Sequence, residues 1–167
     1  LTVENLDESN LPFGIGYHPA FAIPFDDRHT FADYEIRFSE PESPLCVNCR
    51  PYGLLHGNLY YLGSNIREIP IDEKLFANDS HCMVNLRSQT IGIYEKDTGR
   101  AVVCDIADFP YTLIWSKPGQ PQFVCIEPWH SLPSAENGST QWEKKPAAAI
   151  LAPGEEWSCT LSTEFVR

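Results

Sequence analysis

The stretch TIGIYEKDTGRAVVCDI, residues 90–106, decides the fold of this chain. Two runs of β-branched and aromatic residues flank the segment DTGR at 97–100, where Gly99 can supply the positive φ of a tight turn. The stretch therefore predicts two antiparallel strands joined as a hairpin. The run MVNLRS at 83–88 predicts a further strand before them.

Short strand-like runs separated by glycine, proline and asparagine continue along the rest of the chain. In YEIRFSE, for example, Tyr34, Ile36 and Phe38 alternate with polar residues, as in a strand buried on one face. No long run has the 3.6-residue period of a helix. We therefore predict an all-β, antiparallel β-sandwich or barrel. Further strands are expected at 34–40, 111–116, 122–129 and 155–166, with a short helical piece near 72–79 and a turn, KPGQP, at 117–121.

Length and charge limit what the chain can do. The 167 residues suit a single domain over 1–167 with a sizeable core. The net charge of −11 disfavours nucleic acids and anionic membrane surfaces as partners, because both attract basic proteins. No apolar run approaches the roughly 18 residues of a membrane-spanning helix, and the start lacks a signal-peptide pattern. We expect a cytoplasmic location, and the absence of an initiator Met predicts a chain that begins inside a longer protein.

The cysteines give little sign of a disulfide framework or a metal centre. Cys104 and Cys125 lie in apolar, strand-like runs and are expected to be small core residues. Cys46 and Cys49 form one C-x-x-C, but no second pair at zinc spacing accompanies it. We therefore predict no metal ligands.

Two residues could carry acid–base chemistry. His18 lies in GYHPAF at 16–21, where Pro19 restrains the preceding backbone and Gly16 permits another backbone segment to approach closely. This rigid imidazole could act as an acid or donor, or it could be a structural histidine bonded to a backbone carbonyl. Glu127 ends the apolar run FVCI, so partial desolvation would raise its pKa and make it a better base. Alternatively, it pairs with a surface cation.

The remaining candidates carry less weight on their own. Asp79, in LFAND, could bind a ligand or could simply form an Asx turn or helix cap. Trp115 and Trp129 could form a face for sugar stacking, although aromatic residues in strands more often belong to the core. The sequence contains no HExxH, no phosphate-binding glycine loop and no G-x-S-x-G.

Taken in order, the motifs LPFGIGYHPAF, LFAND, FPYTLIWS, FVCIEPWHSLP and LAPGEEW resemble the aldose 1-epimerase (galactose mutarotase) family, in particular its bacterial branch associated with lactose and galactose operons. The resemblance implies a large antiparallel β-sandwich, often called a supersandwich. It also implies cofactor-free interconversion of the α and β anomers of free aldohexoses such as galactose or glucose. By this resemblance His18 donates a proton to the ring oxygen and Glu127 removes the proton of the C1 hydroxyl. Asp79, Tyr17 and Trp129 are then expected to bind the sugar.

The chain departs from this family in its extent. It begins where the second half of the family pattern begins, so the sugar-binding histidine and arginine of the first half have no counterpart here. We expect the C-terminal part of the sandwich without its N-terminal strands, and exposed sheet edges would invite pairing into a homodimer. Two alternatives stay open, a non-catalytic carbohydrate-binding module and a hexose-phosphate epimerase. The latter would need clustered cations, whereas its candidates are scattered at Arg50, Arg67, Lys144 and Lys145.

Overall fold

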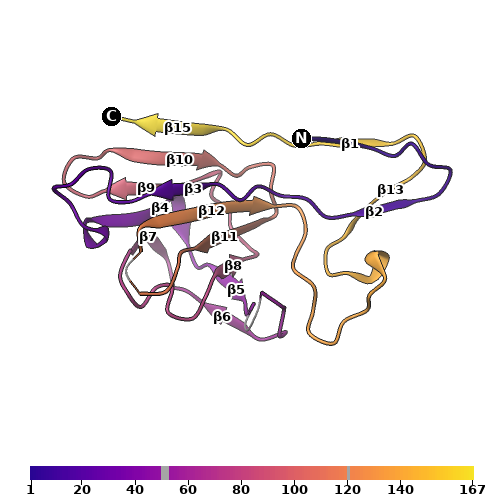
Figure 1. Ribbon diagram of the computed structural model, residues 1–167, viewed down its shortest axis with the longest axis horizontal. Coiled ribbons are helices and arrows are strands. Elements are labelled where there is room, and N and C mark those ends of the chain that lie inside the picture. Colours follow the sequence, from indigo (N-terminus) through magenta and orange to yellow (C-terminus); the bar gives the residue numbers. More distant parts are fainter. Residues whose placement is uncertain (50–52, 120) are drawn as a thin grey trace.

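The computed structural model describes residues 1–49, 53–119 and 121–167, and almost all of the regular secondary structure in these ranges is β-strand (Figure 1). The helices within these ranges are two single 3-10 turns, η1 (Phe31–Asp33) and η2 (Trp142–Lys144), and neither is long enough to cross a membrane. The strands are β1 (Thr2–Glu4), β2 (Leu11–Phe13), β3 (Ala20–Ala22), β4 (Tyr34–Glu42), β5 (Leu45–Val47), β6 (Leu59–Tyr61), β7 (Ile66–Pro70), β8 (His81–Met83), β9 (Thr90–Glu95), β10 (Ala101–Asp105), β11 (Tyr111–Trp115), β12 (Phe123–Trp129), β13 (Ala149–Leu151), β14 (Glu156–Ser158) and β15 (Thr163–Val166).

In the described part of the chain, the strands form two larger and two small sheets. The five-stranded sheet has the order β15-β10-β9-β4-β7, and the six-stranded sheet has the order β3-β12-β11-β8-β5-β6. The pairs β1–β14 and β2–β13 form the small sheets, which extend to one side of the larger ones (Figure 1). All of these strand pairs are antiparallel, which confirms the predicted fold class.

The two larger sheets pack against each other through one apolar core, as in a β-sandwich. Alternate residues of β4 face this core, as the sequence pattern predicts. The five-stranded sheet contributes Tyr34, Ile36, Phe38, Ile91 and Ile93 to the core, and the six-stranded sheet contributes Met83, Ile114, Val124 and Ile126. The opposite face of the six-stranded sheet is therefore available for a site.

The predicted hairpin at 90–106 is confirmed as β9 and β10. Glu95 N donates to Arg100 O at 2.8 Å, and Gly99 adopts φ +75°, a backbone conformation that favours glycine. Arg100 Nε also donates to the buried carboxylate of Glu95 at 2.7 Å, and this bond lowers the Glu95 pKa to about 2.

Three local predictions are wrong. The strand expected at 83–88 ends at Met83, because Arg87 N and Ser88 N donate to Glu42 Oε1 instead of to a neighbouring strand. The single strand expected at 155–166 is two strands, β14 and β15, because they pair with β1 and β10 in different sheets. The helical piece near 72–79 is a series of turns. Within the turn predicted at 117–121, Gln120 lies outside the described residues.

Candidate active site

The candidate site lies on the face of the six-stranded sheet that points away from the sandwich core. In β12, Val124 and Ile126 face the core, so Cys125 and Glu127 project from the other face. Leu113 of β11 lies opposite Glu127 in the antiparallel register and projects to the same side. The alternation of β12 thus places a carboxyl group on a sheet face that is otherwise apolar.

The strand register also brings His18 to Glu127. Ala20 pairs with Cys125, and Gly16 forms an isolated bridge with Trp129, so His18 lies directly across from Glu127. The two side chains meet with 3.3 Å between His18 Nε2 and Glu127 Oε1. Residues that are 109 positions apart in the chain (127 − 18) therefore form one pair.

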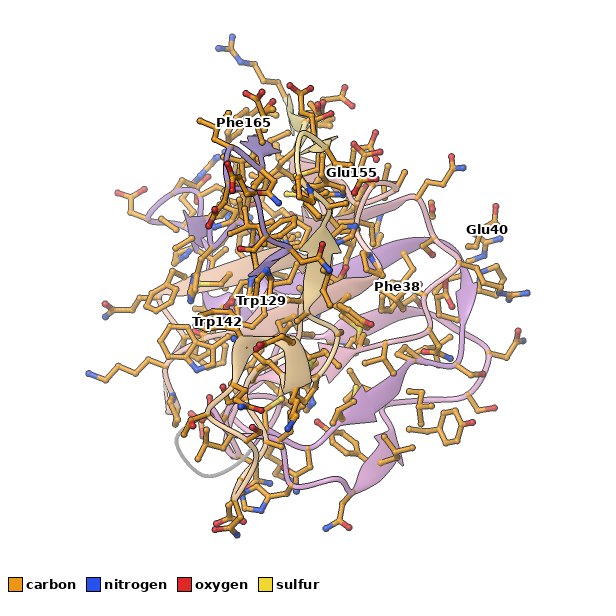
Figure 2. The ribbon with its side chains drawn as sticks, turned by 90° about the vertical axis from the view of Figure 1, so that its right-hand side faces the viewer. Phe38, Glu40, Trp129, Trp142, Glu155 and Phe165 are labelled. Carbon is orange, nitrogen blue, oxygen red and sulfur yellow. The ribbon has the colours of Figure 1, made fainter. Side chains whose placement is uncertain are left out.

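Gly16 and Trp129, the latter labelled in Figure 2, determine how closely this segment approaches β12. Tyr17 N donates to Pro128 O at 3.0 Å, and Trp129 Nε1 donates to Tyr17 O at 3.0 Å. A Cβ atom at Gly16 would lie only 2.5 Å from Trp129 Cδ1, so a larger residue would push the two segments apart. Close packing against Trp129 therefore requires a glycine at position 16, two residues before His18.

The members of the pair occupy very different surroundings. The Glu127 side chain is 3% exposed, whereas the His18 side chain is 57% exposed. Burial raises the pKa of Glu127 to about 8, and the negative charge of Asp79 adds to this rise. The environment of Glu127 therefore gives it the basicity expected of a general base near neutral pH.

Asp79 reaches the same site from the turn that precedes β8. Its backbone has φ +79°, a left-handed conformation that aspartate tolerates better than most residues. Asp79 Oδ1 accepts a hydrogen bond from Ser80 N at 2.8 Å, as expected for a local turn, and the side chain also lines the cavity. The turn and the ligand-binding interpretations of Asp79 are therefore compatible.

A cavity of about 180 Å³ opens above these residues. The His18 imidazole packs edge-on against the Trp115 ring, with 6.2 Å between the ring centroids. Polar groups thus share the cavity with two indoles, a combination that suits a small polar ligand with apolar faces. The described residues lining the cavity are His18, Cys49, Gly53, Asp79, Ser80, Leu113, Trp115, Glu127, Trp129 and Pro133.

Tyr17 is placed differently from the other predicted site residues. It is not among the described residues that line the cavity, because its ring packs against Phe109 with 5.8 Å between centroids. Its hydroxyl accepts a hydrogen bond from the amino group of Leu1 at 3.3 Å. Tyr17 therefore reaches the site through its backbone carbonyl, which holds the Trp129 indole.

Sequence reasoning missed several lining residues. The register of β11 and β12 brings Leu113 to the cavity, and the alternation within β11 could have identified it alongside Trp115. Cys49 was considered only as part of a C-x-x-C, and the pattern around it gives no sign that it faces the cavity.

The lysine and arginine residues considered for phosphate binding lie away from the cavity or outside the described residues. Arg67, Lys144 and Lys145 do not line the cavity, and Arg50 is outside the described residues. Among the lining residues that the structure describes, His18 is the one side chain that can carry a positive charge.

The fold and site can be compared with known proteins. The family model for aldose 1-epimerase matches residues 1–164. Protein LacX (plasmid) from Lactococcus lactis subsp. lactis is 30% identical over 155 residues, which cover 90% of this chain and 52% of that relative.

Solved structures show the same similarity. A galactose mutarotase-like protein from Lactobacillus casei ATCC 334 matches with a TM-score of 0.86 and 26% identity, covering 98% of this chain and 57% of that one. A galactose mutarotase related enzyme from Lactobacillus acidophilus matches with a TM-score of 0.89 and 23% identity, covering 99% and 56% respectively. The chain thus spans about half the length of the proteins it matches.

Proposed function

Because the chain belongs to the aldose 1-epimerase family, we propose that it carries the acid–base centre of a mutarotase that interconverts the α and β anomers of free aldohexoses such as galactose or glucose. The observation that carries this proposal is the His18–Glu127 pair, with Nε2 and Oε1 3.3 Å apart at the cavity wall. The similarity to galactose mutarotase-like proteins supports the same class of reaction.

The spacing of the pair suits the opening of a hemiacetal ring. This step removes a proton from the C1 hydroxyl and delivers one to the ring oxygen. Both oxygens are bonded to the same carbon, so the base and the acid must act within a few ångströms of each other. The short distance between Glu127 Oε1 and His18 Nε2 supplies an acceptor and a donor at this kind of spacing.

The proposed proton path is closed over one catalytic cycle. Glu127 takes the proton of the C1 hydroxyl, protonated His18 gives a proton to the ring oxygen, and the C1–O5 bond breaks to leave an aldehyde. Rotation about the C1–C2 bond exposes the other carbonyl face. On closure, His18 recovers its proton from the C5 hydroxyl and Glu127 returns its proton to the carbonyl oxygen, which gives the other anomer.

The other lining residues would hold the sugar. Asp79 projects into the cavity beside Glu127, where its carboxylate can accept hydrogen bonds from ring hydroxyls. Trp115 and Trp129 offer indole faces for the apolar side of the ring. Two carboxylates in one small cavity disfavour a phosphate dianion, so the lining supports a neutral sugar over a phosphosugar.

The activity of the whole protein is part of this proposal, because the chain spans about half of its relatives. A cytoplasmic location and the pairing of two copies remain predictions.

Anomer exchange measured by magnetisation-transfer NMR, with galactose and then glucose, tests the proposal. Glu127→Gln should reduce exchange to the spontaneous rate while leaving the circular dichroism spectrum intact. Glu42→Gln is the matched control, because Glu42 is equally buried and does not line the cavity. Full exchange in Glu127→Gln would remove Glu127 from the role of base. Sugar binding without exchange in the unmodified protein would support the carbohydrate-binding module instead.

A further inference from the structure

A thiol lies beside the acid–base pair. Cys125 and Glu127 are two positions apart on β12 and project from the same face of the sheet, and His18 faces them across the adjacent segment. The His18 ring nitrogen, the Cys125 Sγ and a Glu127 carboxylate oxygen all lie within 4.8 Å of one another. The proposed reaction uses the imidazole and the carboxylate but gives the thiol no role.

We propose that His18, Cys125 and Glu127 form a binding site for a thiophilic divalent cation such as Zn²⁺, which on binding would engage both groups of the acid–base pair. The chemistry of the donor set supports this assignment. One imidazole nitrogen, one thiolate and one carboxylate oxygen are all zinc ligands, and three protein ligands leave a fourth position open for water. Harder ions such as Mg²⁺ prefer oxygen ligands and would bind poorly here.

The geometry requires little rearrangement. Zinc–ligand bonds of about 2.0–2.3 Å place tetrahedral ligand atoms about 3.3–3.8 Å apart. His18 Nε2 and Glu127 Oε1 already meet this requirement at 3.3 Å, and Cys125 Sγ, which lies within 4.8 Å of both, needs to approach them by at most about 1–1.5 Å. The imidazole can move towards the thiol, because the His18 side chain is 57% exposed, and side-chain rotation of Cys125 or Glu127 would close the remaining gap.

The electrostatics of the cavity also favour a cation. The Asp79 carboxylate lies near Glu127, and the repulsion between the two charges would be relieved by a divalent ion. A second His–carboxylate trio in the described chain, Asp26, His29 and Glu95, provides a contrast. There, Arg100 Nη2 already donates to Glu95 at 2.7 Å and to Asp26 at 2.6 Å, so the negative charge is neutralised within the fold.

Zinc binding is measurable without any sugar. Titration of the protein with Zn²⁺ against a chromophoric chelator should reveal one site, and Mg²⁺ should not compete for it. Cys125→Ala should weaken this site by at least about 10–100-fold, since even the loss of an outer partner of a metal ligand has that effect. Cys104→Ala is the matched control, because this cysteine is also buried in a strand but belongs to the other sheet.

Two further measurements guard against ambiguous outcomes. His18→Gln should also lose the site, and its exposure makes a folding defect unexpected, so it serves if Cys125→Ala fails to fold. Co²⁺ in place of Zn²⁺ should give a thiolate-to-cobalt charge-transfer band. Zn²⁺ affinity that is unchanged in His18→Gln or in folded Cys125→Ala would overturn the proposal. Loss of the site in Cys49→Ala alone would equally overturn it, because the ion would then be bound elsewhere in the cavity.

Discussion

Replacing Glu127 by glutamine should stabilise the protein, and increasingly so as the pH rises. The folded-state pKa of Glu127, about 8, lies above the ordinary value of 4.5, so the folded protein holds a proton that the unfolded chain releases. The contribution of this group to the free energy of unfolding is therefore fully present below about pH 4.5, and it is lost as the pH rises through 8. Since each tenfold change in a protonation equilibrium is worth about 1.4 kcal/mol, the full loss amounts to roughly 3–5 kcal/mol.

Urea denaturation of the wild type and of Glu127→Gln at about pH 5 and pH 9 measures this difference. The two proteins should be similar at the lower pH, and the variant should be more stable by roughly 3–5 kcal/mol at the higher pH. Glu95→Gln is the control of opposite sign. The pKa of Glu95 is lowered to about 2, so its loss should destabilise the protein at neutral pH and matter less as the pH falls towards 2. A Glu127→Gln difference that does not change with pH would refute the reasoning.

Three further predictions concern the same site. The limb of the kcat/KM pH profile that is set by ionisation of Glu127 should move to lower pH in Asp79→Asn, because this variant removes a charge that repels the Glu127 carboxylate. Gly16→Ala, whose Cβ would lie 2.5 Å from Trp129 Cδ1, should cost about 1–3 kcal/mol in urea denaturation and slow exchange. Trp129→Phe removes the indole donor to Tyr17 O and should cost about 1 kcal/mol in the same assay.

The sequence predicts those parts of the fold that depend on local pattern. Alternation in 34–40 and the turn at 97–100 correspond to β4 and to the β9–β10 hairpin. The strand expected at 83–88 is wrong because two of its backbone donors, Arg87 N and Ser88 N, bind the side chain of Glu42, which is more than forty residues away in the chain. Period-2 patterns contain no information about such a distant acceptor. Nor could the pattern of 155–166 show that its two ends pair with strands in different sheets.

For the candidate site, too, the sequence predicts what depends on local pattern and misses what depends on strand register. His18 and Glu127 carry local signals, a proline-restrained imidazole and a carboxyl at the end of an apolar run, but only the strand register brings them together. The placement of Tyr17 could have been anticipated, because neighbours in an extended segment point to opposite sides and His18 faces the cavity. Cys125 was expected to be a small core residue, and it is buried as expected. Its position beside the proposed acid–base pair follows from its spacing of two from Glu127 once β12 is known.

Three glutamates in the described chain are buried, and two of them are saturated with hydrogen-bond donors. Glu42 Oε1 accepts from Arg87 N at 2.8 Å, from Ser88 N at 2.7 Å and from Ser88 Oγ at 2.8 Å. Glu95 accepts from both Nε and Nη2 of Arg100 at 2.7 Å. These carboxylates hold loops and turns in place, and neither could release its donors without breaking the local structure.

Glu127 is the third, and its surroundings differ in kind. Its partner in the described chain is the imidazole of His18, which lies 3.3 Å away on a largely exposed side chain. Because that side chain can move without disturbing the core, Glu127 would, under the proposed function, exchange its partner for a sugar hydroxyl at little cost to the fold. Few hydrogen-bond donors reach Glu127, so burial raises its pKa to about 8. The donors around Glu95, by contrast, lower the pKa of that residue to about 2. All three glutamates are buried, so burial does not separate the proposed acid–base carboxyl from the two structural ones. The difference lies in the number of hydrogen-bond donors that the fold places around each carboxyl group.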